Sequence, residues 1–154
     1  MSQNIRLGAG GIILNQGKIL LVKHGADVHG KDFLVGPGGH VENGESIPQA
    51  VVREVKEETG LTVNPVKILF VEDLKSNRSR VIKLWYLCSS IDGTLSKTQN
   101  AIQEGIVNAG WYSQHELEHE VVYPSILAKL DWNNFKKNDW ETRYIEFQDP
   151  DADI

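Results

Sequence analysis

Residues 39–61 read GHVENGESIPQAVVREVKEETGL, and this stretch decides the fold. Its second part carries the signals of an α-helix over residues 46–59. Ser46 and Gln49 form a capping-box pattern, in which each side chain bonds the other residue's backbone N–H. Gly60 suits the position after the last turn, because glycine adopts the left-handed conformation there without strain. The sequence therefore predicts one well-delimited helix.

Three glutamates lie on one face of this helix. Glu54, Glu57 and Glu58 are spaced i, i+3 and i+4, which places them within a wedge of roughly 100°. The apolar residues on the same side are Ile47, Val51 and Val55. Crowding carboxylates beside a stripe that should be buried costs repulsion and desolvation, and a bound hard cation relieves both. An all-oxygen set suits Mg²⁺ or Mn²⁺ better than zinc.

A glycine-rich run, Gly36-Pro37-Gly38-Gly39, precedes the helix. Its backbone freedom predicts a loop without regular structure. Such a loop lets backbone groups approach a metal or a phosphate without a side-chain clash. A divalent metal, a close backbone and carboxylates are together the equipment for attacking a phosphate with an activated water.

Residues 39–61 resemble the Nudix box, G-x5-E-x7-R-E-U-x-E-E-x-G-U with U an aliphatic residue, and match it at every specified position. From average composition, a chance match at a given start is on the order of 10⁻⁹. The resemblance implies an α+β fold, the Nudix-type α/β/α sandwich with a mixed β-sheet. It also implies Mg²⁺- or Mn²⁺-dependent hydrolysis of a phosphoric anhydride bond in a nucleoside triphosphate, a modified nucleotide or a nucleotide sugar.

The resemblance assigns metal ligands by matching position. Glu54, Glu57 and Glu58 would bind the metal, and Glu58 would be the most indispensable of the three. The backbone carbonyl of Gly38, just before the box, would be a further ligand.

The resemblance also assigns supporting and catalytic roles. Glu45 would support the cluster, and Arg53 would orient it through carboxylate contacts. Many family members add a glutamate from a loop shortly before a tryptophan, and Glu104, seven residues before Trp111, fits that position. Glu104 is a candidate general base or additional metal ligand, and it competes with Glu54 for the role of base.

Four basic residues are candidates for substrate binding. Lys23, Arg78 and Arg80 could clamp phosphates, because nearby cations balance the charge of a diphosphate. His40, inside the box, could touch the substrate. The alternatives are solvent-exposed charges at strand ends and an ordinary loop histidine. The sequence does not name the substrate, because loops and strand ends set specificity.

The remaining sequence predicts one domain over 1–147 and an acidic, flexible tail over 148–154. A second amphipathic helix is predicted from Pro124 to Lys136, with proline at its first position. A short helix is predicted at 113–119. Strand patterns occur at residues 7–14, 18–23, 66–71, 81–88 and 105–111.

Composition narrows the function classes. The 154 residues carry 16 Lys plus Arg against 21 Asp plus Glu, a net charge of −5. An acidic chain is a poor binder of nucleic acid polymers, and no apolar stretch approaches the ~18 residues of a membrane span. The single cysteine, Cys88, excludes an intrachain disulfide and favours the cytoplasm. The oligomeric state stays open, a homodimer included.

Two alternatives to the enzyme remain. One is a catalytically silent Nudix-fold module that senses a nucleotide. The other is a small zinc peptidase, because residues 115–119, HELEH, match H-E-x-x-H, which on an α-helix places both histidines on one face.

Overall fold

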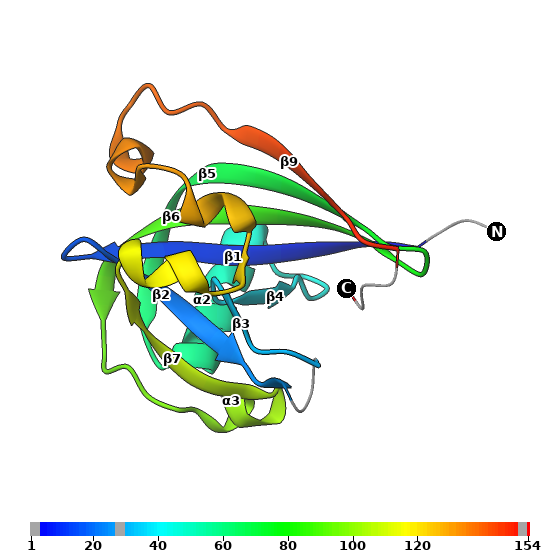
Figure 1. The fold of residues 1–154 in the computed structure, drawn as a ribbon, viewed down its shortest axis with the longest axis horizontal. Coiled ribbons are helices and arrows are strands. Elements are labelled where there is room, and N and C mark those ends of the chain that lie inside the picture. The colour runs from blue at the N-terminus through cyan, green and yellow to red at the C-terminus, as the bar shows by residue number, and fades with distance from the viewer. Residues whose placement is uncertain (1–3, 27–29, 151–153) are drawn as a thin grey trace.

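The computed structural model describes residues 4–26, 30–150 and 154, which form one mixed β-sheet of nine strands in two halves (Figure 1). One half contains β1 (Ile5–Asn15), β4 (Gly38–His40), β5 (Thr62–Lys75), β6 (Arg80–Asp92) and β9 (Arg143–Gln148). The other half contains β2 (Lys18–His24), β3 (Phe33–Val35), β7 (Ile106–Tyr112) and β8 (Val122–Tyr123). The helices are α2 (Ile47–Thr59) and α3 (Gln99–Gln103), with the 3₁₀-helices η1 (His115–His119), η2 (Ser125–Ala128) and η3 (Trp132–Lys136).

Strand β1 is central, because it pairs on both of its edges. It runs parallel to β6 on one side, and on the other it pairs antiparallel with β4 near its start and with β2 near its end. Beyond β6 the sheet continues antiparallel to β5 and then parallel to β9. Parallel and antiparallel pairs together make the mixed sheet that the sequence predicts.

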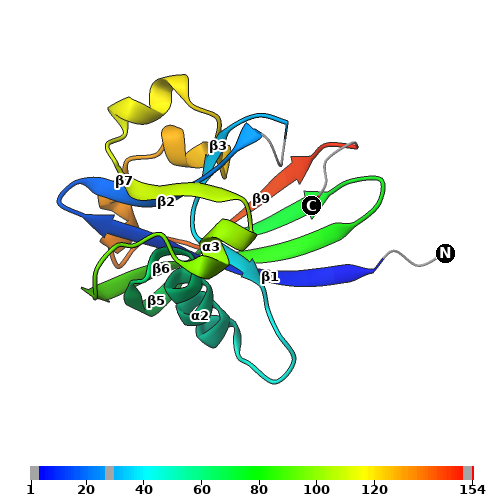
Figure 2. The same cartoon turned by 90° about the horizontal axis from the view of Figure 1, so that it is seen from below.

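The sheet is covered on two sides, with α2 on one face and the 3₁₀-helices on the other (Figure 2). Buried side chains beneath α2 include Val51 and Val55, and each contributes about 1.5–3 kcal/mol. On the opposite face Phe70 and Trp85 pack with Phe135 of η3. The α+β sandwich expected from the sequence is therefore observed, with its second layer made of 3₁₀ turns.

Helix α2 forms where the capping signals predict it. The Ser46 hydroxyl accepts from the Gln49 N–H at 3.2 Å, and the Gln49 side chain accepts from the Ser46 N–H at 2.8 Å. At the other end Gly60 has φ of 81°. These local bonds fix where the helix begins and ends, and hence which side its glutamates occupy.

The expectation that residues 36–39 lack regular structure is wrong in part. Gly38–His40 forms β4, which pairs antiparallel with β1. A Cβ atom at Gly38 would lie 2.5 Å from the carbonyl oxygen of Ala9, so glycine is what permits this close strand pairing.

The α-helix expected from Pro124 to Lys136 is also wrong, because the chain forms η2 and η3 instead. Leu127 and Trp132 are both buried, yet five residues would separate them by about 140° on an α-helix. Breaking the helix lets both reach the same core. Asp131 then caps η3 by accepting from the Asn133 N–H at 3.0 Å.

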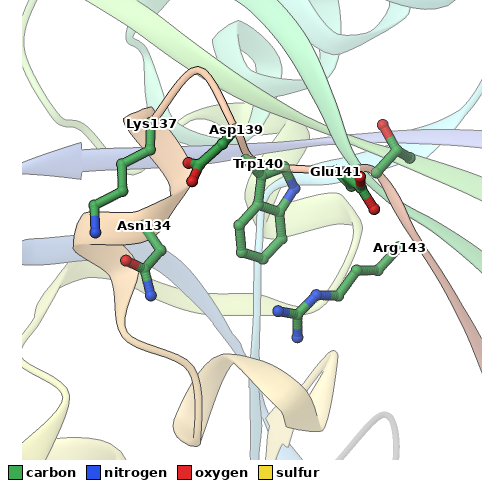
Figure 3. Close-up of a pocket in the computed structure, with 7 residues that line it drawn as sticks. Asn134, Lys137, Asp139, Trp140, Glu141 and Arg143 are labelled. Atoms are coloured by element: carbon green, nitrogen blue, oxygen red, sulfur yellow. The ribbon is translucent and has the colours of Figure 1, made fainter.

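Strand β9, which the sequence did not reveal, follows η3. The segment between them lines a surface cavity of about 440 Å³ (Figure 3). The expected tail over 148–154 begins inside β9 at Gln148, and the Asp149 N–H donates to the Lys75 carbonyl. Residues 151–153 lie outside the described residues.

None of the described helices is long and apolar enough to cross a membrane. The cytoplasmic location and the homodimer considered from the sequence stay predictions.

Candidate metal centre and active site

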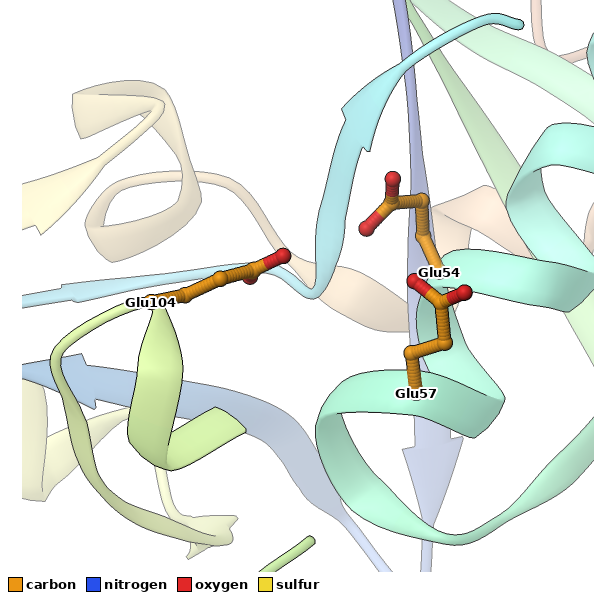
Figure 4. A group of neighbouring side chains, drawn as sticks. All are labelled: Glu54, Glu57 and Glu104. Atoms are coloured by element: carbon orange, nitrogen blue, oxygen red, sulfur yellow. The ribbon is translucent and has the colours of Figure 1, made fainter. Parts of the chain in front are cut away.

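Three carboxylates from two helical segments converge at one point (Figure 4). Glu54 and Glu57 come from α2, and Glu104 is the residue that ends α3. One oxygen from each lies within 4.8 Å of the others. Sequence positions 50 residues apart thus form a single oxygen-rich cluster, as the sequence predicts for a metal centre.

Contacts between α3 and α2 hold Glu104 in place. Thr98 caps α3 by accepting from the Ala101 N–H at 3.0 Å, and its hydroxyl donates to the Glu57 carbonyl. Ala101 is buried against Val22 of β2. These contacts fix the end of α3, and with it the Glu104 backbone, next to α2.

The Arg53 guanidinium orients the carboxylates around it. It forms a bidentate pair with Glu45 at 2.7 and 3.0 Å, and it donates to Glu54 at 2.9 Å and to Glu57 at 3.2 Å. It also donates to the backbone carbonyl of His40 at 2.9 Å. Hydrogen bonds from Arg53 lower the pKa of Glu45 to about 2. Arg53 thus links Glu45 to Glu54 and Glu57, while the supporting roles of Arg53 and Glu45 stay predictions.

Two of the box carboxylates are buried in the protein. Glu54 is 6% exposed and Glu58 only 2%. Burial raises the pKa of Glu54, and burial followed by repulsion from Glu104 and Glu54 raises the pKa of Glu58 well above its ordinary value. The second oxygen of Glu54, Oε2, is buried without a hydrogen-bond partner. An orphaned carboxylate oxygen inside an all-oxygen cluster fits a hard divalent cation such as Mg²⁺ or Mn²⁺.

Strand β4 closes over this cluster. The Gly38 N–H donates to Glu58 Oε1 at 3.2 Å, while the role of its carbonyl as a metal ligand stays a prediction. A Cβ atom at Gly39 would lie 2.5 Å from Glu54 Oε1. The glycine at position 39 therefore leaves the space that the Glu54 carboxylate occupies.

The four predicted substrate-binding residues lie outside the acid cluster. Lys23 is on β2, opposite Leu34 of β3, and the His40 side chain is exposed. Arg78 lies in the exposed turn between β5 and β6, and Arg80 pairs with Asp73 at 2.7 and 3.0 Å. Their roles toward the substrate stay predictions.

Sequence reasoning missed Lys83, a half-buried lysine on β6 whose Nζ lies 4.2 Å from the Trp85 ring centroid. Burial lowers the pKa of Lys83, and the charges of Glu72 and Glu58 oppose that shift. A usable signal was present, since strand alternation puts Lys83 on the same face as Val81 and Trp85, both buried. A positive charge among buried side chains needs a carboxylate partner, because burying an unpaired charge is costly.

The H-E-x-x-H segment does not build a zinc site. It forms the 3₁₀-helix η1, in which residues four apart are about a third of a turn out of line. His115 is 87% exposed in its side chain and lies 3.3 Å from Glu118. The zinc-peptidase alternative therefore loses its geometric basis.

Comparison with known proteins places this chain in one family. The family model described as NUDIX domain matches residues 4–131. The ADP-ribose pyrophosphatase of Methanocaldococcus jannaschii is 32% identical over 126 residues, covering 80% of this chain and 72% of that protein. The 8-oxo-dGDP phosphatase NUDT18 of Mus musculus is 34% identical over 108 residues. The matched region covers 69% of this chain but only 32% of the mouse protein.

A solved structure agrees with these sequence matches. The MutT NUDIX hydrolase from Burkholderia pseudomallei superposes with a TM-score of 0.70 at 25% identity, over 82% of this chain and 96% of that one.

Proposed function

The chain belongs to the Nudix hydrolase family, and on that premise we propose that it hydrolyses a nucleoside diphosphate-linked compound in the presence of Mg²⁺ or Mn²⁺. One observation carries this proposal. Glu54, Glu57 and Glu104 bring carboxylate oxygens within 4.8 Å of one another, and a buried oxygen of Glu54 lacks a partner. A purely structural cluster of like charges would be destabilising, so its presence favours a cation-dependent role.

Each residue of the site has a part in this proposal. Glu54, Glu57, Glu58 and Glu104 would hold the divalent cation. When bound, the cation would neutralise diphosphate charge and acidify a water molecule. Arg53 keeps the carboxylates aimed at one point, and its forked pair with Glu45 fixes its own orientation.

Glu54 and Glu104 are the two candidates for the general base. Burial is the first cause that raises the pKa of each, and repulsion from Glu54 adds to the shift at Glu104. A raised pKa makes a carboxylate a better acceptor for the proton of an attacking water near neutral pH. Replacing the true base should remove the acidic limb of the pH–rate profile.

The substrate class follows from the relatives. One is named an ADP-ribose pyrophosphatase and another an 8-oxo-dGDP phosphatase, and both names contain a nucleoside diphosphate. We therefore infer a substrate that contains a nucleoside and a diphosphate, with or without a further group on the diphosphate. A small phosphorylated molecule also agrees with the net charge of −5, which disfavours polymeric nucleic acid.

A hydrolysis screen tests the proposal. The panel is nucleoside triphosphates, oxidised nucleotides, nucleotide sugars, ADP-ribose and dinucleoside polyphosphates, each with Mg²⁺ and with EDTA. The expected result is Mg²⁺-dependent release of phosphate, pyrophosphate or a nucleoside monophosphate from at least one compound. No turnover across the panel, together with measurable nucleotide binding, would instead support the catalytically silent module.

A further inference from the structure

A second cavity, of about 250 Å³, lies where β8 and η2 approach β9. Its walls are largely apolar and aromatic, and the Tyr123 and Phe147 rings meet edge to face at 5.7 Å between centroids. The lining residues are Glu72, Tyr123, Pro124, Ser125, Ile126, Ile145, Glu146 and Phe147.

One buried carboxylate distinguishes this cavity. Glu72 is 6% exposed, and its Oε1 accepts from the Trp85 indole N–H at 2.9 Å. The larger cavity beside η3 has no such group, because its charged side chains, Lys137, Asp139, Glu141 and Arg143, are all exposed and carry both signs (Figure 3). Only the smaller of these two cavities therefore places a desolvated polar side chain on its wall.

Lys83 connects the cavity with the acid cluster. It is the cross-strand neighbour of Glu72 in the β5–β6 pair, and the charges of Glu72, Glu58 and Glu54 oppose the lowering of its pKa by burial. A molecule that places a ring against Glu72 can therefore direct a charged group past Lys83 toward the carboxylates of α2. That arrangement matches a nucleotide, with its base and its phosphates at opposite ends.

We propose that this cavity binds the nucleobase of the substrate and that Glu72 selects a guanine-type base; this deepens the proposed function and rests on it. The cavity is smaller than the ~300–1,000 Å³ of sites that enclose a whole drug-sized ligand, so it suits one ring system. Aromatic walls favour a flat, partly apolar ring.

The choice of base follows from hydrogen-bond chemistry. Burial raises the pKa of Glu72, whereas the hydrogen bond from Trp85 and the charge of Lys83 favour its ionised form, and an ionised carboxylate only accepts hydrogen bonds. Guanine and its 8-oxo form present two adjacent donors, the ring N1–H and the exocyclic amino group, and both can bond to a carboxylate. Adenine presents an acceptor nitrogen beside its amino group, which would face the carboxylate lone pairs unfavourably. Glu72 thus favours the oxidised or ordinary guanine nucleotide over the adenine of ADP-ribose.

Metal-free binding tests this assignment. Isothermal titration with dGMP and dAMP in EDTA gives the dissociation constants for the parent protein and for Glu72→Gln. The parent should bind dGMP at least about tenfold more tightly than dAMP, the effect of hydrogen bonds to a charged group. In Glu72→Gln this ratio should fall toward one, because the amide replaces one acceptor with a donor. Glu118→Gln, on the exposed part of η1, is the matched control and should keep the parental ratio.

Each result decides the proposal separately from the proposed function. Equal or tighter dAMP binding by the parent, an unchanged ratio in Glu72→Gln, or no dGMP binding at millimolar concentration overturns the base assignment, whatever the enzyme hydrolyses. Guanine preference that depends on Glu72, in a protein that hydrolyses nothing in the screen, upholds the assignment and refutes only the hydrolase. If Glu72→Gln does not fold, the parental ratio alone decides.

Discussion

At the scale of single residues, Arg53 determines how the acid cluster is held. Its one planar guanidinium bonds Glu45, Glu54, Glu57 and the carbonyl of His40 at the same time. A lysine ammonium offers the charge without the fork, so it cannot reproduce the bidentate pair with Glu45. A lysine at position 53 therefore separates the effect of the positive charge from the effect of the guanidinium on carboxylate orientation.

Arg53→Lys should lower kcat about 10- to 100-fold with little change in KM, the usual cost of losing a group that orients metal ligands. Steady-state kinetics with a substrate found in the screen measure kcat and KM for both proteins. Arg143→Lys is the matched control, because Arg143 is exposed and stacks on Trp140. Parental kcat in Arg53→Lys would show that charge alone suffices.

A second prediction at the scale of single residues concerns Gly39. Alanine at this position would push against the Glu54 carboxylate, since its Cβ would lie 2.5 Å from Oε1. Gly39→Ala should therefore weaken Mn²⁺ binding about tenfold or more, measured by calorimetry. In Gly110→Ala the new Cβ meets nothing closer than 3.6 Å, so Mn²⁺ affinity should stay parental. Equal affinities in the two variants would refute the steric account.

At the scale of elements, the success of sequence-based prediction depends on where the deciding contacts lie. Helix α2 was predictable because Ser46, Gln49 and Gly60 fix both of its ends locally. The 3₁₀-helices were not, because burial of Leu127 and Trp132 in a distant core overrides the local helical pattern. Strand β9 could not be predicted for the same reason, because its extended conformation is stabilised by pairing with the distant strand β5.

The site divides in the same way. The box positions identified Glu54 and Glu57, the family's glutamate before a tryptophan identified Glu104, and the fold brings the three together. Glu72 escaped notice because its importance arises from a cross-strand pairing that no local spacing encodes, whereas strand alternation does mark Lys83 as a cation between buried neighbours.

Asp73 ties β9 to the rest of the sheet. It accepts from Arg80 of β6 and, at 2.7 Å, from the Tyr144 hydroxyl of β9. Mainly through the Arg80 bonds, the pKa of Asp73 falls to about 2, below the ordinary value of 3.8. Because the folded-state pKa is lowered, this stabilisation is present above about pH 4 and disappears as the pH falls through about 2.

Asp73→Asn should therefore reduce the free energy of unfolding at pH 7 by on the order of 2 kcal/mol. The difference from the parent should shrink as the pH is lowered from 4 toward 2. Urea denaturation at several pH values measures it, with the exposed Asp139→Asn as control. A difference that does not change with pH would contradict the assignment.

At the scale of the whole molecule, the acidity is concentrated in two places. The box, residues 39–61, holds five acidic residues against two basic ones, a net charge of −3, and residues 146–154 hold four acidic residues and no basic one, a net charge of −4. Burial raises the pKa of Glu54, Glu58 and Glu104, so the metal-free protein is destabilised while these groups are ionised and gains stability as falling pH protonates them. A bound cation should remove the same penalty.

Mg²⁺ should therefore raise the melting temperature more at pH 8 than at pH 5. At a concentration 100 times its Kd, the cation adds about 2.7 kcal/mol of stability. Differential scanning calorimetry with and without EDTA measures the effect. A shift of the same size at both pH values would argue against binding by these carboxylates.

The most direct test of the account compares Mg²⁺-dependent hydrolysis by the parent, by Glu57→Gln and by Glu118→Gln. Glu57 belongs to the converging cluster, whereas Glu118 is an exposed glutamate of η1. The account predicts a loss of about 100-fold or more in Glu57→Gln and parental rates in Glu118→Gln, since a lost metal ligand removes several kcal/mol of transition-state stabilisation. Parental turnover by a folded Glu57→Gln protein would contradict the claim that these carboxylates form the active site.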